Sequence, residues 1–136
     1  MNRLLALVAT ITGLVLSAGA HADSWAPPEI EAYVSADRRA RLTVTPRDVD
    51  GPFRYFEDKV RGREPAGQRP DSARTQATGG LELRRQDGRW NLLWERPLLN
   101  EAAPVPALVS NDGAYVVTFD NWGSVGVGSN VVVIRP

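Results

Sequence analysis

The chain contains no cysteine and a single histidine, His21, among its 136 residues. The lack of cysteine excludes disulfide bridges, thiolate metal sites and cysteine nucleophiles. The only histidine lies near the N-terminus, where catalytic sites rarely form, so Ser-His-Asp sites and histidine-ligated zinc, copper or haem are not expected. The sequence therefore predicts no cofactor and no metal ion.

The chain also lacks an excess of charge of either sign, because 16 basic residues balance 16 acidic ones. Nucleic acid and anionic membrane surfaces, which attract basic proteins, are therefore not expected as partners. A sustained 3.6-residue period is absent after residue 22, which predicts little helix in the folded part of the chain.

The N-terminal segment Met1–Ala22 has the pattern of a secretory signal peptide. Arg3 supplies the positive charge, Leu4–Leu16 is the apolar stretch, and two A-x-A cleavage patterns end at Ala20 and at Ala22. Cleavage after Ala22, or alternatively after Ala20, predicts a periplasmic or secreted protein. The apolar stretch is shorter than the ~20 residues of a membrane-spanning helix, so no stable membrane anchor is expected after cleavage.

Removal of residues 1–22 leaves 114 residues, which suits a single domain over 23–136. Alternation of apolar and polar residues predicts an all-β fold of antiparallel hairpins. The expected strands are Ile30–Ser35, Ala40–Thr45, Gly80–Arg85, Trp90–Glu95, Leu108–Ser110, Ala114–Asp120 and Val131–Arg135. The last of these is apolar on both faces, which is typical of a strand at the centre of a sheet.

The segment between the second and third predicted strands is the least regular part of the chain. It begins with an aromatic cluster, Phe53, Tyr55 and Phe56, which we expect to anchor the segment to the core. The alternative is an exposed patch that binds a partner. Arg61–Gln76 is rich in glycine, proline and charge, and it predicts a long mobile loop.

Three segments align on an aspartate in a turn, namely Asp37, Asp87 and Asp112. The residues three, five and seven positions after each aspartate share one face, which we expect to point into the core. These residues are Ala40, Leu42 and Val44, then Trp90, Leu92 and Trp94, then Tyr115, Val117 and Phe119. The aspartates themselves are expected to accept backbone N–H bonds within their turns, which is a structural role.

The turn beginning at Ser110 resembles the S-x-D-G-x-[YW] hairpin of β-propeller blades of the TolB-like type. Val116–Asn121 together with Asn130–Ile134 is similar to segments of exported bacterial proteins that have no assigned activity. The resemblance implies propeller-blade-like sheets, but 114 residues supply about two blades and a closed propeller needs at least about four. The chain would then form a homo-oligomer, belong to a longer propeller, or fold as a small sandwich or partial barrel.

A glycine-rich loop over Asp120–Asn130 is the candidate ligand site. Trp122 could stack on a sugar or an aromatic ligand, while Asp120, Asn121 and Asn130 supply hydrogen bonds. The alternative is a plain connection in which Trp122 packs back on the core.

Two weaker patterns consist of carboxylates. Asp48 and Asp50 have a loose resemblance to a calcium loop, without its further ligands. Four carboxylates are available for glycan hydrolysis, but nothing in the sequence pairs any two of them: Glu82, Glu95, Glu101 and Asp120.

The composition and motifs favour a non-enzymatic binding or interaction module, whose partner is a protein or a small glycan or peptide. The first alternative is a structural subunit of a larger β assembly, which the blade-like hairpins suggest. The second is a glycan hydrolase that uses two carboxylates.

Overall fold

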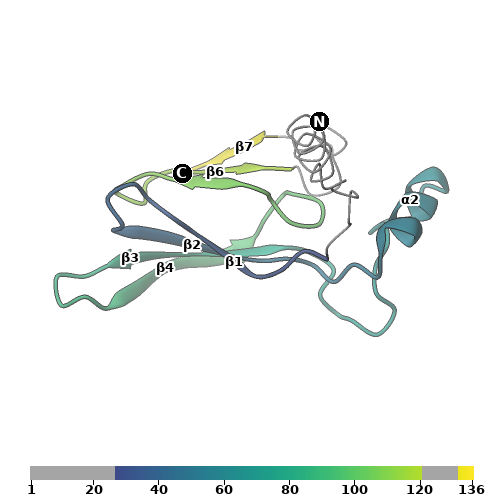
Figure 1. Ribbon diagram of the computed structural model, residues 1–136, viewed down its shortest axis with the longest axis horizontal. Coiled ribbons are helices and arrows are strands. Elements are labelled where there is room, and N and C mark those ends of the chain that lie inside the picture. Colours follow the sequence, from purple (N-terminus) through teal and green to yellow (C-terminus); the bar gives the residue numbers. More distant parts are fainter. Residues whose placement is uncertain (1–26, 121–131) are drawn as a thin grey trace, which may run out of the picture.

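The computed structural model describes residues 27–120 and 132–136, and it shows two antiparallel sheets stacked as two layers (Figure 1). One short helix, α2 (Pro52–Val60), lies beyond one end of the two layers. The described chain is therefore mainly β, as predicted. The predicted signal peptide, residues 1–22, lies outside the described residues. Within the described ranges, no helix is long and apolar enough to span a membrane.

Seven strands follow one another along the chain, and each pairs with its sequence neighbours within its own sheet. The first sheet has the order β1 (Glu31–Val34), β2 (Ala40–Thr45), β3 (Thr78–Arg84) and β4 (Trp90–Pro97). The second has the order β5 (Ala107–Val109), β6 (Val116–Phe119) and β7 (Val132–Arg135). The predicted strand ends agree with these within two residues.

The doubly apolar strand β7 differs from the prediction in its position. Among the described residues it lies at an edge of the second sheet, and β6 is the central strand. Residues 132 to 135 alternate between exposed and partly buried, so only one face of β7 is directed at the first sheet.

The core lies between the two layers. Leu42 and Val44 of β2 and Leu81 of β3 pack against Ala107 of β5 and Val116 of β6, and all five are at most 5% exposed. Ala40 is also fully buried, so the predicted inward face of β2 is confirmed.

The predicted inward face of β4 is wrong for two of its three residues. Trp94 packs against the core, but Trp90 and Leu92 lie on the outer face together with Glu82. The pairing register shifts at Leu93, which is an extra residue on β4. Such a bulge inverts the alternation of the residues beyond it, and a simple count of alternating positions cannot detect it.

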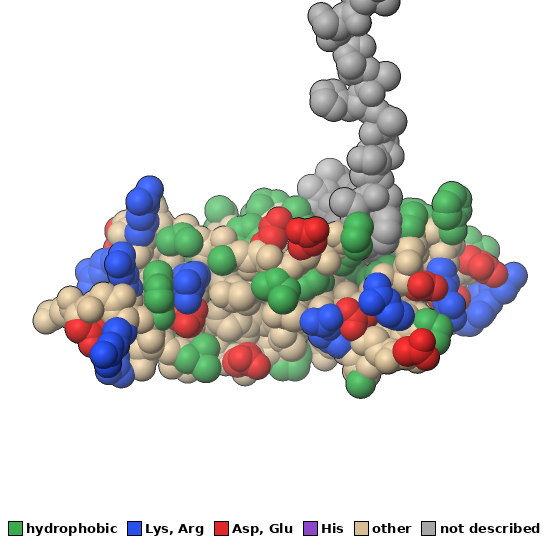
Figure 2. Space-filling view, turned by 60° about the horizontal axis from the view of Figure 1, so that its bottom comes forward, with side chains coloured by type: hydrophobic (Ala, Val, Ile, Leu, Met, Phe, Trp, Pro, Cys, Tyr) green, Lys and Arg blue, Asp and Glu red, His purple; other side chains and the backbone are tan. Residues whose placement is uncertain are grey.

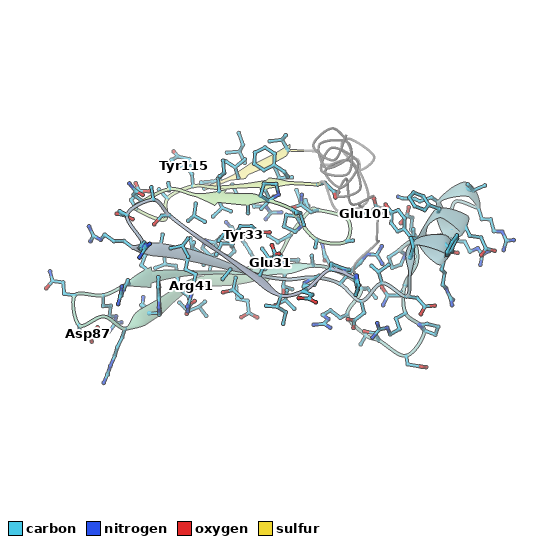
Figure 3. All side chains as sticks on the ribbon, in the orientation of Figure 1. Glu31, Tyr33, Arg41, Asp87, Glu101 and Tyr115 are labelled. Carbon is cyan, nitrogen blue, oxygen red and sulfur yellow. The ribbon has the colours of Figure 1, made fainter. Side chains whose placement is uncertain are left out.

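The predicted inward face of β6 is wrong for all three residues. Val116 and Thr118 are buried, whereas Tyr115 is 57% exposed and points away from the first sheet (Figure 3). Val117 and Phe119 also lie on the outer face and are only partly buried. The second sheet therefore turns the opposite face of the same kind of hairpin toward the core.

The three turns themselves repeat as predicted. Each aspartate, Asp37, Asp87 and Asp112, accepts the backbone N–H of the residue two positions later at 3.0, 3.0 and 2.9 Å. In the first and third turns a serine hydroxyl also donates to the aspartate, at 2.8 and 2.7 Å. The residue after each aspartate has a positive φ, and in the first turn this residue is Arg38, with φ 59°.

A helix not expected from the sequence occupies the aromatic segment. Helix α2 spans Pro52–Val60, with proline in the first turn, where its missing N–H has no intrahelical partner to lose. Nine residues make about two and a half turns, which is too short for a clear 3.6-residue period in the sequence.

The segment that follows α2, residues 61–76, forms no helix or strand. It is tied to the chain before α2 by a bridge between Val49 and Gln68 and by an ion pair between Asp48 and Arg74. The hydrogen bond from Arg74 and a second from Ser72 lower the pKa of Asp48. Asp48, one of the two carboxylates with a loose resemblance to a calcium loop, is thus engaged within the protein.

We predict that Arg38→Gly stabilises the protein by about 0.5–1 kcal/mol, because glycine adopts a positive φ without the steric cost that a side chain carries. Arg39→Gly, one residue later and outside the positive-φ region, is the matched control and should destabilise the protein by a few tenths of a kcal/mol. Urea unfolding of both variants measures this, and equal effects would contradict the argument.

Candidate functional site

Only one of the four predicted site residues, Asp120, lies in the described chain, while Asn121, Trp122 and Asn130 lie outside the described residues. Asp120 follows β6 and is 8% exposed, so its side chain is directed inward. Its Oδ2 accepts the backbone N–H of Glu101 at 3.1 Å. Burial raises the pKa of Asp120, which the nearby Glu101 carboxylate also favours. This carboxylate therefore holds the connection before β5.

Glu101 is the centre of a polar cluster at the end of the two layers nearest α2 (Figure 3). The Tyr55 hydroxyl donates to Glu101 Oε2 at 2.8 Å, and Lys59 forms an ion pair with Oε1. Lys59 Nζ also pairs with Glu64 Oε1 at 2.8 Å. Two residues of α2 are thus joined to the connection between β4 and β5.

The environment shifts the pKa values of this cluster in a consistent way. Burial, followed by the hydrogen bond to Glu101, raises the pKa of Tyr55. Burial lowers the pKa of Lys59, but its hydrogen bonds to Glu101 and Glu64 outweigh burial and raise it. The bond from Lys59 lowers the pKa of Glu64. Lysine stays charged and tyrosine stays neutral at physiological pH, which suits a structural network.

The structure brings together two of the four carboxylates that the sequence left unpaired, Glu101 and Asp120. Both are engaged: Glu101 by Tyr55 and Lys59, and Asp120 by a backbone N–H. Glu82 is on the first sheet and pairs with Arg41 at 2.6 Å. Glycoside hydrolysis needs two carboxylates that face a shared cleft and a sugar ring. The arrangement gives no support to that hypothesis, and the described residues hold no group of three potential metal ligands.

The inner side of α2 is held very close to the loop that follows it. Tyr55 and Asp58 are 4% and 8% exposed, and Asp58 Oδ2 accepts the backbone N–H of Gly67 at 2.9 Å. Gly67 has φ 65°, and a Cβ added to it would lie 2.8 Å from Tyr55 Cα. Only glycine allows this approach. Tyr55 also packs with Val49, Ala66 and Ala102 in a second, smaller core.

The outer side of α2 is apolar and exposed. Phe53 and Val60 are 91% and 89% exposed, and Phe56 is 48% exposed. Their spacing of three and four residues places them along one side of a helix, opposite Tyr55 and Asp58. We call these three side chains the α2 stripe.

The α2 stripe is the functional candidate that the strand-based sequence analysis missed. The signal was present in the aromatic cluster, in which Tyr55 anchors the segment as expected whereas Phe53 is exposed. The assumption that all three aromatic residues share one fate was wrong, because neighbouring positions on a helix point in different directions.

Two open pockets lie elsewhere on the described chain. One, of about 420 Å³, is bordered by Arg47, Glu64 and Glu101, whose charged groups already contact other parts of the chain. The other, of about 360 Å³, lies between β1 and the connection before β5, with Tyr33 and Glu31 hydrogen-bonded to one another at its wall (Figure 3). Neither presents a convergent set of unengaged polar groups.

The chain matches no protein-family model, and no match to it is found among curated proteins or solved structures.

We predict that Gly67→Ala destabilises the protein by about 3 kcal/mol, through the positive φ and the collision with Tyr55 together. Gly62→Ala is the matched control, since Gly62 has φ 64° with nothing within 4 Å of an added Cβ. The control should cost about 1 kcal/mol. Denaturant unfolding measures both. If the two variants lost equal stability, α2 would not be held against this loop.

We predict that Asp120→Asn is more stable than the wild type at pH 7. The raised pKa of Asp120 means that its charge opposes folding at neutral pH, and this cost disappears as the pH falls through the folded pKa. Asparagine keeps an oxygen for the Glu101 N–H without the charge. The advantage of the variant should therefore shrink in unfolding experiments at about pH 4.

Asp112→Asn is the control, and its expected effect on stability at pH 7 has the opposite sign. The N–H of Ala114 and the Ser110 hydroxyl lower the pKa of Asp112, so its charge favours folding above the unfolded pKa. This variant should be less stable than the wild type at pH 7, and the difference should fade in acid. The same sign for both variants would contradict the assignment of Asp120 as a penalised buried charge.

Proposed function

We propose that this protein is a non-enzymatic interaction module that presents α2 to an apolar groove on a partner protein. The observation that carries this is the exposure of Phe53 and Val60, 91% and 89%, on a helix whose opposite side is anchored. Apolar residues at positions i, i+3 and i+7 are the anchors by which a helix docks into a groove.

The anchoring of α2 favours binding because the helix is already ordered and loses less conformational entropy when it binds. An isolated nine-residue helix is marginal in water, so a free peptide of this sequence would lose conformational entropy on binding. Here Tyr55, Asp58 and Lys59 fix the helix to the body of the protein, through Glu101 and Gly67. The α2 stripe is thus presented in a preformed helix, at the end of the molecule (Figure 1).

The charges around the α2 stripe favour a protein groove over an anionic membrane. Arg54 pairs with Asp50 at 3.3 Å, and Arg61 pairs with Glu57 at 2.6 Å. A membrane-binding helix carries unpaired basic residues beside its apolar face, so that they meet lipid headgroups. Paired charges give a polar rim without strong net charge, which is typical of protein interfaces.

The proposal includes export and a blade-like relation of the two sheets. The pattern of Met1–Ala22 supports export to the periplasm or beyond. The shared turn chemistry at Asp37 and Asp112 supports the blade-like relation, because the two hairpins use opposite faces against one core. Asn111 Oδ1 also accepts the N–H of Asp37 at 3.2 Å, so both turns lie at the same end.

We predict that a photoreactive phenylalanine at position 53 or 60 cross-links to one protein partner in cells that export the chain. Gln86, in the turn beside Asp87 at the opposite end of the molecule, is the control position (Figure 3). Adding Phe56→Ser should reduce the adduct from position 53 by about tenfold or more, as expected for an anchor residue. Circular dichroism checks that each variant is folded.

Two outcomes would contradict the proposed function. Equal adducts at positions 53 and 86 would show that the contact is not specific for α2. Adducts to lipid alone would replace the protein groove by a membrane surface.

A further inference from the structure

A second apolar surface covers the outer side of the second sheet. The cross-strand pairs place Leu108, Val117 and Ile134 in one row, and Phe119 beside Val132 in the next. Tyr115 precedes β6 on the same side (Figure 3). We call these six side chains the outer face of the second sheet. Four of them are more than half exposed: Leu108 58%, Tyr115 57%, Val132 54% and Ile134 68%.

The outer face of the first sheet is different in kind. Arg41 pairs with Glu82 at 2.6 Å, and its guanidinium lies 4.3 Å from the centre of the Trp90 ring. Figure 2, which brings this side forward, shows charged side chains mixed with the hydrophobic ones. The outer face of the first sheet is therefore suited to contact with water. The six residues of the outer face of the second sheet, by contrast, include no charged side chain.

The repeated hairpin indicates that the outer face of the second sheet is equivalent to a face that is covered by another layer in the first sheet. The residues three and five positions after Asp112 are Tyr115 and Val117, which point outward. Their equivalents after Asp37 are Ala40 and Leu42, which are fully buried beneath the second sheet. The outer face of the second sheet thus corresponds to the face of the first sheet that carries another layer.

We propose that a second copy of this chain covers the outer face of the second sheet, so that two molecules pack through the same face about a twofold axis. The face is uncharged, so two copies meet without like-charge repulsion. The exposures above correspond to an apolar surface on the order of 600 Å² per molecule. A dimer would bury on the order of 1,200 Å² in total, which is at the lower end of stable interfaces. The roughly 600 Å² on each molecule is at the upper end of the apolar patches that monomers expose.

A head-to-tail arrangement fits the structure less well. It would place the outer face of the second sheet against the outer face of the first, and so bury the Arg41–Glu82 pair. Burying an ion pair carries a desolvation cost that its own attraction often fails to repay. Head-to-tail contacts also continue into rings or filaments, whereas a twofold contact closes at two copies. Packing the outer faces of two second sheets against one another avoids both the burial of the ion pair and the continuation into rings or filaments.

The test is the mass in solution, measured by sedimentation equilibrium over a range of protein concentrations. The wild-type protein, recovered after export, should form a dimer and no larger species. Ile134→Lys and Leu108→Lys place a charge on the outer face of the second sheet and should each raise the dissociation constant at least tenfold. Circular dichroism and thermal unfolding identify any variant that fails to fold, and each of the two variants tests the face independently.

Two control variants separate this proposal from its alternatives. Leu92→Lys changes a side chain that is 54% exposed on the outer face of the first sheet, and the dimer should persist. Phe53→Lys changes the α2 stripe, and the dimer should also persist, so a failure of the helix-docking function leaves this result unaffected. A monomeric wild type would overturn the proposal. So would a trimer or larger ring, or a dimer that Leu92→Lys breaks.

Discussion

One buried guanidinium joins the parts of the structure on which α2 depends. Arg47, just after β2, is 1% exposed. Its Nε donates to the carbonyl of Glu101 at 2.8 Å, its Nη2 to the carbonyl of Ala66, and its Nη1 to Gln68 Oε1 at 3.5 Å. Its backbone N–H binds the carbonyl of Ala102 at 3.0 Å. Burial lowers the pKa of Arg47, which the charge of Glu101 opposes, and arginine remains charged in proteins. Removing this group would leave several buried acceptors unpaired, each at a cost of about 1–3 kcal/mol.

This dependence explains why an apolar helix can stand beyond the end of two sheets. The chain leaves β2 at Arg47, forms α2, and returns through residues 61–76, where two of the acceptors of Arg47 lie. The third acceptor is the backbone carbonyl of Glu101, whose side chain is the partner of Tyr55 and Lys59. Charge and hydrogen bonding therefore fix a helix that contributes only Tyr55 to the apolar core. Phe53 and Val60, which are 91% and 89% exposed, therefore contribute little to holding the helix in place.

Features that depend on neighbouring residues, such as strand bounds and turn bonds, were predicted well from the sequence. Features that depend on how strands and sheets pack together, such as the inward face of a strand, were not. The bounds of β2 and the N–H bonds accepted by Asp37, Asp87 and Asp112 follow from local alternation and turn chemistry. The inward face of β6 depends on which side of the second sheet meets the first, which no local pattern encodes. The bulge at Leu93 depends on pairing with β3. The contact of Asp120 with the backbone N–H of Glu101, 19 positions away, likewise depends on how distant segments pack.

The exposed apolar residues of the described chain are explained less well by internal contacts than the charged residues are. In the described chain, the charged clusters at Glu101 and Asp48 are explained by the segments they join. Among the described residues, the most exposed side chains of the α2 stripe and of the outer face of the second sheet, such as Phe53, Val60 and Ile134, bury little apolar area and so add little stability to the monomer. A side chain such as Phe53, 91% exposed on an anchored helix, contributes hydrophobic free energy only when its surface is removed from water. In the proposed function a partner protein removes this water, and an apolar partner surface fits best because the paired charges around α2 offer little to a charged one.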